Sequence, residues 1–124
     1  KAVKECAYHV RRSGEWILRL GDGTSESHDR AQSALDELWG YSHELFASDA
    51  VDRAMADAKV VPDLVDVYEP WRREVEATLT EATLQIPHDD WQATGGREGV
   101  HTEHMGHLLA ELQVLQRTYP ELEW

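Results

Sequence analysis

The sequence predicts an all-α protein, an antiparallel helical bundle. Apolar residues recur every three or four positions in several long segments, which is the period of an α-helix. The alternating pattern of a β-strand is absent from the sequence. Glycine, proline and capping residues separate the helical segments. The 124 residues are the length of one helical domain, residues 1–124.

The composition of the sequence excludes several classes of protein. The formal charge is −12, from 12 basic and 24 acidic residues, which argues against binding to nucleic acid or to an anionic membrane. No apolar run is long enough to cross a membrane, and no signal peptide is present. Cys6 is the single cysteine, so no internal disulfide forms and a cytoplasmic location is expected. The chain begins with Lys1 inside a helical pattern, which predicts a fragment.

The first predicted helix covers residues 2–20 and has two organised faces. Its apolar stripe consists of Val3, Cys6, Ala7, Val10, Gly14 and Ile17. The other side carries Glu5, His9, Arg12 and Trp16. Two such faces predict a helix in the interior of a larger bundle, with Cys6 as a buried, inert thiol. Gly21-Asp22-Gly23 is expected to end this helix, with a glycine in the left-handed conformation.

Thr24 or Ser25 is expected to cap the second helix, with Glu26 in its first turn. Its predicted buried seam consists of Ala31, Ala34, Leu35, Leu38, Ser42 and Leu45. A short acidic helix follows, from Ser48-Asp49-Ala50 to near Lys59. The acidic segment 49–66 is interpreted as a solvated face.

The next helix is predicted over residues 69–84, because Pro70 fits the first turn of a helix. It would bury Trp71, Val75, Leu79 and Ala82. A loop over residues 86–96 follows, with Trp91 as its anchor, and a final His-rich helix ends before Pro120. The tryptophans are expected to be core or interface anchors: Trp16, Trp39, Trp71, Trp91 and Trp124.

The His-rich segment is the candidate metal site. His104, His107 and Glu111 share one helical stripe, and His101 heads the neighbouring apolar stripe. The order His101-Thr102-Glu103-His104 differs from the His-Glu-x-x-His of zinc proteases. A di-iron bundle needs Glu-x-x-His on two helices, and the sequence has one such motif, Glu98-Gly99-Val100-His101. Its glutamate is expected to precede the helix. Histidines and Glu103 in structural or interface hydrogen bonds are therefore favoured over a metal.

A phosphate cradle is the alternative interpretation of Gly21-Asp22-Gly23-Thr24, which precedes a helix. Neither a preceding strand nor a lysine accompanies it, so a turn followed by a cap is favoured. Asp22 and His28 are expected to clamp this turn to a neighbouring helix.

Four segments carry a resemblance to a known family: residues 16–28, 81–84, 101–104 and 115–120. They resemble, in order and across essentially the whole chain, the PaaC-type subunit of the phenylacetic acid catabolic family. Such subunits belong to the ring-1,2-phenylacetyl-CoA epoxidase, a bacterial multicomponent monooxygenase of phenylacetate degradation. The resemblance implies the C-terminal half of a longer ferritin-like subunit.

The same resemblance implies a structural, non-catalytic role. A sister subunit holds the di-iron centre, so this chain is expected to have no catalytic residue and no cofactor of its own. Its partners would be that catalytic subunit and the other components of the complex. Glu5 and His9 lie four residues apart and are interpreted as a hydrogen-bonded remnant of a lost metal site. An independent metalloenzyme using His101, His104, His107 and Glu111 is the alternative.

The absence of the other half of such a bundle has a consequence for association. The first two helices would expose apolar faces, and burial of apolar surface is the main force in protein association. The fragment is therefore expected to form a two-fold homodimer through these helices.

Overall fold

The computed structural model describes residues 1–88 and 90–123. All regular structure within these ranges is helical, which confirms the predicted all-α bundle. The chain divides into two compact units, unit 1 (Lys1–Ala93) and unit 2 (Thr94–Trp124). None of the helices in the described ranges has both the length and the apolar character needed to span a membrane. The elements of unit 1 are α1 (Ala2–Gly21), α2 (Ser25–Ser42), η1 (His43–Phe46), α3 (Ala50–Asp57) and α4 (Leu64–Glu81).

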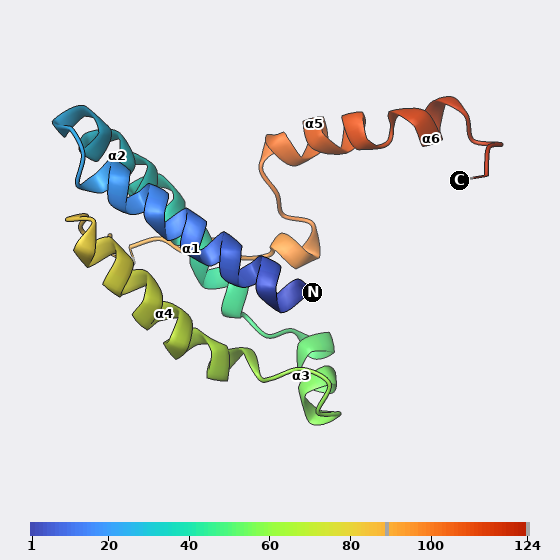
Figure 1. The fold of residues 1–124 in the computed structure, drawn as a ribbon. Helices are drawn as coiled ribbons and strands as arrows, with labels where there is room; N and C mark the ends of the chain where they lie inside the picture. Colours follow the sequence, from blue (N-terminus) through green and yellow to red (C-terminus); the bar gives the residue numbers. More distant parts are fainter. Residues whose placement is uncertain (89, 124) are drawn as a thin grey trace. The chain divides into compact units, whose positions relative to one another are not determined.

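Three long helices build unit 1 (Figure 1). Helix α1 packs against both α2 and α4. Helix α2 runs antiparallel to α1, as a short turn between them dictates (Figure 1). Helix α3 lies near the far end of α2, and α4 starts there and runs antiparallel to α2, in the same direction as α1 (Figure 1). The end of α1, the start of α2 and the end of α4 consequently meet at one end of unit 1.

The core of unit 1 is small and lies between these three helices. Its buried side chains are Trp39, Leu79, Ala82 and Leu84, and the half-buried residues around them are Ile17, Leu18, Ala31, Leu35, Trp71 and Val75. Of the four residues predicted to be buried by this helix, Leu79 and Ala82 are buried, whereas Trp71 and Val75 are only half-buried.

The predicted seam of α2 is wrong in part. Ala34 and Leu38 are exposed, Leu38 at 63%, and Leu45 in η1 is exposed to the same degree. Trp39 and Gly40 are buried in their place. Each residue turns the helix by about 100°, so Leu38 lies about 100° around the helix from the buried Trp39. It falls at the edge of the face that packs through Ala31, Leu35 and Trp39.

Helix α4 begins several residues earlier than its predicted start, near Glu69. The carboxylate of Asp63 caps it, accepting a hydrogen bond from the backbone N–H of Val65 at 3.1 Å. Pro70 therefore lies inside the helix, where it removes the amide that would bond the carbonyl of Asp66. Aromatic packing offsets this loss: the ring of Phe46 lies 5.1 Å from that of Tyr68 and 4.8 Å from that of Trp71.

The first half of α1 is exposed. Its apolar stripe is covered only where Gly14, Ile17 and Gly21 approach α2 and α4, while Val3 is 83% exposed. Cys6 is also exposed, which corrects the expectation of a buried thiol. The reason is that no element of unit 1 covers residues 1–11.

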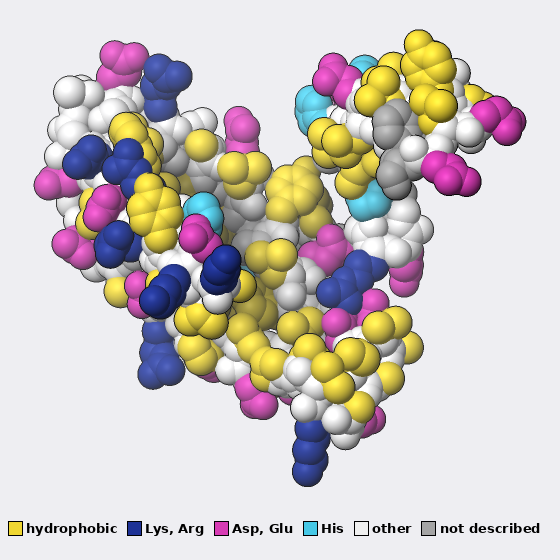
Figure 2. Space-filling model, turned by 45° about the vertical axis from the view of Figure 1, so that its right-hand side comes forward, with side chains coloured by type: hydrophobic (Ala, Val, Ile, Leu, Met, Phe, Trp, Pro, Cys, Tyr) yellow, Lys and Arg dark blue, Asp and Glu magenta, His cyan; other side chains and the backbone are white. Residues whose placement is uncertain are grey.

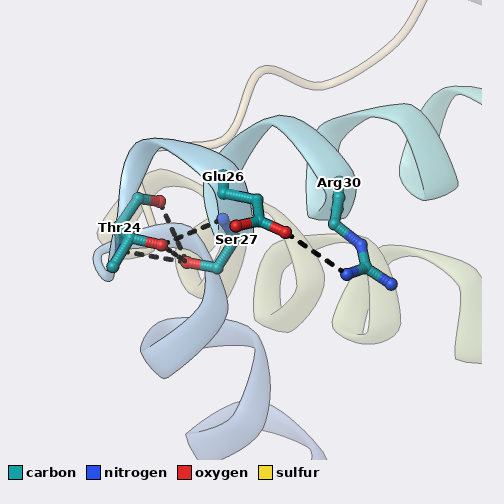
Figure 3. Close-up of polar contacts among 4 residues, drawn as sticks. All are labelled: Thr24, Glu26, Ser27 and Arg30. Atoms are coloured by element: carbon teal, nitrogen blue, oxygen red, sulfur yellow. Dashed lines mark hydrogen bonds and ion pairs between the residues drawn. The ribbon is translucent and has the colours of Figure 1, made fainter.

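Thr24, one of the two caps that the sequence predicts, starts α2 and forms a capping box with Ser27 (Figure 3). The Thr24 hydroxyl accepts the backbone N–H of Ser27 at 3.2 Å, and the Ser27 hydroxyl accepts that of Thr24 at 3.0 Å. Glu26 faces the positive end of the helix and forms an exposed ion pair with Arg30 at 3.6 Å. These contacts fix the point at which the chain reverses from α1 to α2.

Unit 2 contains η2 (Gly96–Glu98), α5 (Glu103–Leu112) and α6 (Val114–Thr118). The predicted single His-rich helix is thus interrupted at Gln113, whose φ of −99° and ψ of 2° lie outside the helical region. No glycine or proline marks this break, so periodicity could not predict it. None of the described residues of unit 2 is buried.

Candidate functional site

The candidate metal ligands of unit 2 do not converge. His104, His107 and Glu111 lie on α5 and are exposed, but His101 precedes the helix and does not head its apolar stripe. Glu98 lies in η2, ahead of α5 as predicted. In the part of the chain that the structure describes, no group of three or more His, Cys, Asp or Glu side chains could hold a metal ion.

Glu5 and His9 lie one turn apart on the exposed half of α1. The expected hydrogen bond between them is not formed, since neither side chain has a hydrogen-bond partner within residues 1–88 and 90–123. The His9 ring instead packs edge-on against Tyr8, with 5.6 Å between the ring centroids. A di-iron centre of the ferritin-like type needs carboxylates and two Glu-x-x-His motifs that project inward. The residues present here do not fit that centre.

The residues that do converge form the helix junction: Gly21, His28, Ala82 and Thr83. Gly21 is buried, and a Cβ built on it would lie 2.8 Å from the Cβ of Ala82 and closer still to the Ala82 carbonyl oxygen. A Cβ on Gly23 would lie 2.5 Å from the carbonyl oxygen of Arg19. Neither glycine has a positive φ, so the predicted left-handed glycine cap is wrong. Glycine is needed at both positions because neighbouring atoms of the same chain lie too close to leave room for a Cβ.

Two side chains hold the carbonyl oxygen of Gly21. Nδ1 of His28 lies 2.8 Å from it, and the Thr83 hydroxyl donates to it at 3.3 Å. A carbonyl oxygen only accepts, so Nδ1 of His28 carries the proton. Asp22, the other expected clamp residue, makes no side-chain hydrogen bond to any described residue.

Thr83 adopts a conformation that is unusual for its type. Its φ is 61°, the left-handed region that β-branched residues rarely occupy. It ends α4 in a Schellman motif, in which the N–H of Leu84 bonds the carbonyl of Leu79 at 2.9 Å. Strain of this kind persists only where surrounding contacts impose it. The hydrogen bond from Thr83 to Gly21 and the packing of Ala82 supply those contacts. The helix junction therefore has a structural role.

Gln32 is a residue that the sequence pattern did not single out. Its side-chain amide pairs with the backbone of Gln85, accepting the N–H at 2.8 Å and donating to the carbonyl at 2.9 Å. It also donates to Asp36 at 2.8 Å. No local pattern predicts this pairing, because the two glutamines are 53 residues apart.

A pocket of about 410 Å³ lies beside this pairing. Trp91 contributes to its wall, as the predicted anchor of the loop. The Trp91 ring covers Gly40 so closely that a Cβ there would collide with it, and it packs against Tyr41 at 4.9 Å. The pocket therefore exists because the loop after α4 is fastened to the end of α2. The fifth tryptophan, Trp124, lies outside the described residues.

Comparison with known proteins agrees with the family motifs. The family model described as phenylacetic acid catabolic protein matches residues 1–124. The C subunit of the 1,2-phenylacetyl-CoA epoxidase of Escherichia coli (strain K12) is 43% identical over all 124 residues. The chain spans about half the length of that curated relative (50%). The resemblance to a PaaC-type subunit is therefore confirmed, and this chain belongs to the phenylacetic acid catabolic family.

Proposed function

We propose that this chain belongs to a structural, non-catalytic subunit of a bacterial phenylacetyl-CoA epoxidase that acts in phenylacetate degradation. The observation that carries the proposal is the 43% identity, over the whole chain, to the C subunit of such an epoxidase. In this role the chain supports a catalytic partner subunit that holds the di-iron centre, and the complex works in the cytoplasm.

The arrangement of the polar residues supports a structural role. The side chains suited to binding iron are exposed within each unit: Glu5 and His9 on α1 of unit 1, and the histidines of α5 in unit 2. The polar side chains of the helix junction, His28 and Thr83, bind a backbone carbonyl and join three helix ends. The alternative function, a metalloenzyme built on His101, His104, His107 and Glu111, gains no support from these positions.

The exposed apolar surface supports a role within an assembly. Large hydrophobic side chains of α1 and α2 that are 58% or more exposed are Val3, Val10 and Leu38. In unit 2, Leu108, Leu112 and Leu115 are each more than half exposed. Burial of a Leu or Val side chain contributes about 1.5–3 kcal/mol, so these residues favour contact with other protein surface.

Co-expression with the di-iron subunit tests the proposed function. We expect the full-length protein to co-purify with that subunit, and metal analysis to find iron in the complex but not in this protein purified alone without chelator. Iron or zinc at one equivalent or more in the isolated protein would contradict the non-catalytic role. Failure to co-purify with any epoxidase subunit would contradict membership of the complex.

The isolated chain of 124 residues is expected to form a two-fold dimer through α1 and α2. Light scattering at micromolar concentration should give about twice the mass of 14.2 kDa. Leu38→Asn is expected to shift the chain toward the monomer, because it removes an exposed apolar side chain from α2, one of the two helices of the expected dimer interface. Val65→Asn, at a 70% exposed position of α4, is the matched control and should leave the mass unchanged. A wild-type monomer at these concentrations would refute the dimer.

A further inference from the structure

The distribution of charge along the chain is uneven. Residues 1–21 contain five of the 12 basic residues but only two of the 24 acidic residues. The basic residues are Lys1, Lys4, Arg11, Arg12 and Arg19. Helix α1 is thus positively charged within a strongly acidic protein. Figure 2 shows dark blue Lys and Arg side chains interleaved with yellow hydrophobic ones at the left of the view.

Arginines and aromatic rings alternate on one side of α1. Tyr8, Arg12, Trp16 and Arg19 follow one another at helical spacing, and Arg11 adjoins them; these five residues are the basic–aromatic face. It lies opposite the side on which Gly14, Ile17 and Gly21 pack. Tyr8 and Trp16 are 49% and 47% exposed. The face therefore points away from α2 and α4.

Stacking holds these side chains in place. The guanidinium carbons of Arg12 and Arg19 lie 5.1 and 5.7 Å from the ring centroid of Trp16. The guanidinium of Arg11 lies 5.8 Å from the ring of Tyr8. Cation–π contacts of this kind contribute about 0.5–1 kcal/mol at exposed sites. Because these contacts favour the stacked arginine rotamers, a partner that binds these rotamers loses less side-chain entropy.

The positive charge of the face is largely uncompensated. Glu15 is shared by two arginines, at 4.0 Å from Arg11 and 3.6 Å from Arg12. Arg19 forms no ion pair with any described residue. The remainder of the chain, with seven basic and 22 acidic residues, repels nucleic acid. Two copies of a positive face also repel each other, so the face does not pair with itself.

We propose that the basic–aromatic face of α1 is a docking surface for a carboxylate-rich segment of the di-iron partner subunit. Arg, Trp and Tyr are the residue types that carry most binding energy at protein interfaces, and guanidinium groups bind carboxylates with two parallel hydrogen bonds. On α1 these residue types lie together on an exposed surface, and the arginines are stacked on the aromatic rings. The face carries more positive than negative charge. The inference rests on the proposed function, since it assigns the surface through which the chain meets its assembly.

A charge-neutralising double variant tests the docking surface. In the full-length protein, Arg12→Gln/Arg19→Gln is expected to weaken binding to the di-iron subunit roughly tenfold or more. Its affinity should also depend less on salt concentration than that of the wild type. The control, Arg30→Gln/Arg73→Gln, removes the same charge from exposed positions of α2 and α4 and should bind like the wild type. Trp16→Ala should weaken binding without changing the charge.

The outcomes separate this inference from the proposed function. Wild-type affinity in Arg12→Gln/Arg19→Gln would overturn the docking surface alone. A wild-type protein that binds no epoxidase subunit would overturn both. A clearly lowered melting temperature of the isolated double variant would show that the face is packed within its own chain, which also overturns the docking surface. Loss of homodimer in this variant, with binding to the di-iron subunit intact, would assign the face to a second copy and overturn the inference.

Discussion

Trp39→Ala is expected to lower the free energy of unfolding of unit 1 by about 3–5 kcal/mol. Trp39 is the largest of the four buried core residues. Its indole stacks on that of Trp71 at 6.2 Å and meets the His43 ring edge-on at 5.9 Å. Domains are stable by only about 5–15 kcal/mol. Removal of this side chain thus takes away a large share of the stability.

Chemical denaturation followed by circular dichroism measures this loss in the full-length protein. Trp16→Ala is the control, because it removes the same side chain from an exposed site on α1. In the isolated protein its effect on unfolding should be well below that of Trp39→Ala. Equal losses for the two variants would show that Trp39 is not the centre of the core.

Gly21→Ala is expected to destabilise the protein by about 1–3 kcal/mol, the cost of overpacking a tight site. The added Cβ would meet the Ala82 carbonyl, and backbone atoms cannot turn aside as a flexible side chain does. Relief requires the end of α4 to shift, which lengthens the hydrogen bonds from His28 and Thr83 to the Gly21 carbonyl.

Gly14→Ala is the matched control for the helix junction, since it adds the same methyl group to the same helix. A Cβ at Gly14 would have one neighbour, Cγ2 of Thr78 at 3.9 Å, which is an ordinary contact. Alanine is also the better helix former, by about 1 kcal/mol. Thermal unfolding should therefore give a melting temperature above that of the wild type for Gly14→Ala and below it for Gly21→Ala. A shift in the same direction for both would refute the steric role of Gly21.

Local patterns in the sequence determined the helices and the family. The 3.6-residue period identified every long helix, and side-chain caps that act within three residues located the starts of α2 and α3. Trp91 was recognisable as an anchor, and Glu98 as a residue ahead of α5, because glycines flank its short turn. The family motifs predicted membership that the comparisons confirm. All of these features depend on residues close together in the chain.

Contacts between residues far apart in the sequence determined the features that local patterns did not predict. Phe46 keeps the segment around Pro70 helical, although the proline by itself favours a helix start. Gly21 is required by Ala82, 61 positions away, and not by its own backbone angles. The expected hydrogen bond of Glu5 and His9 failed because both side chains stay in solvent, where water competes for each of them. Periodicity shows which residues share a helix face, but the partner that covers the face, and how closely it approaches, is set by the fold.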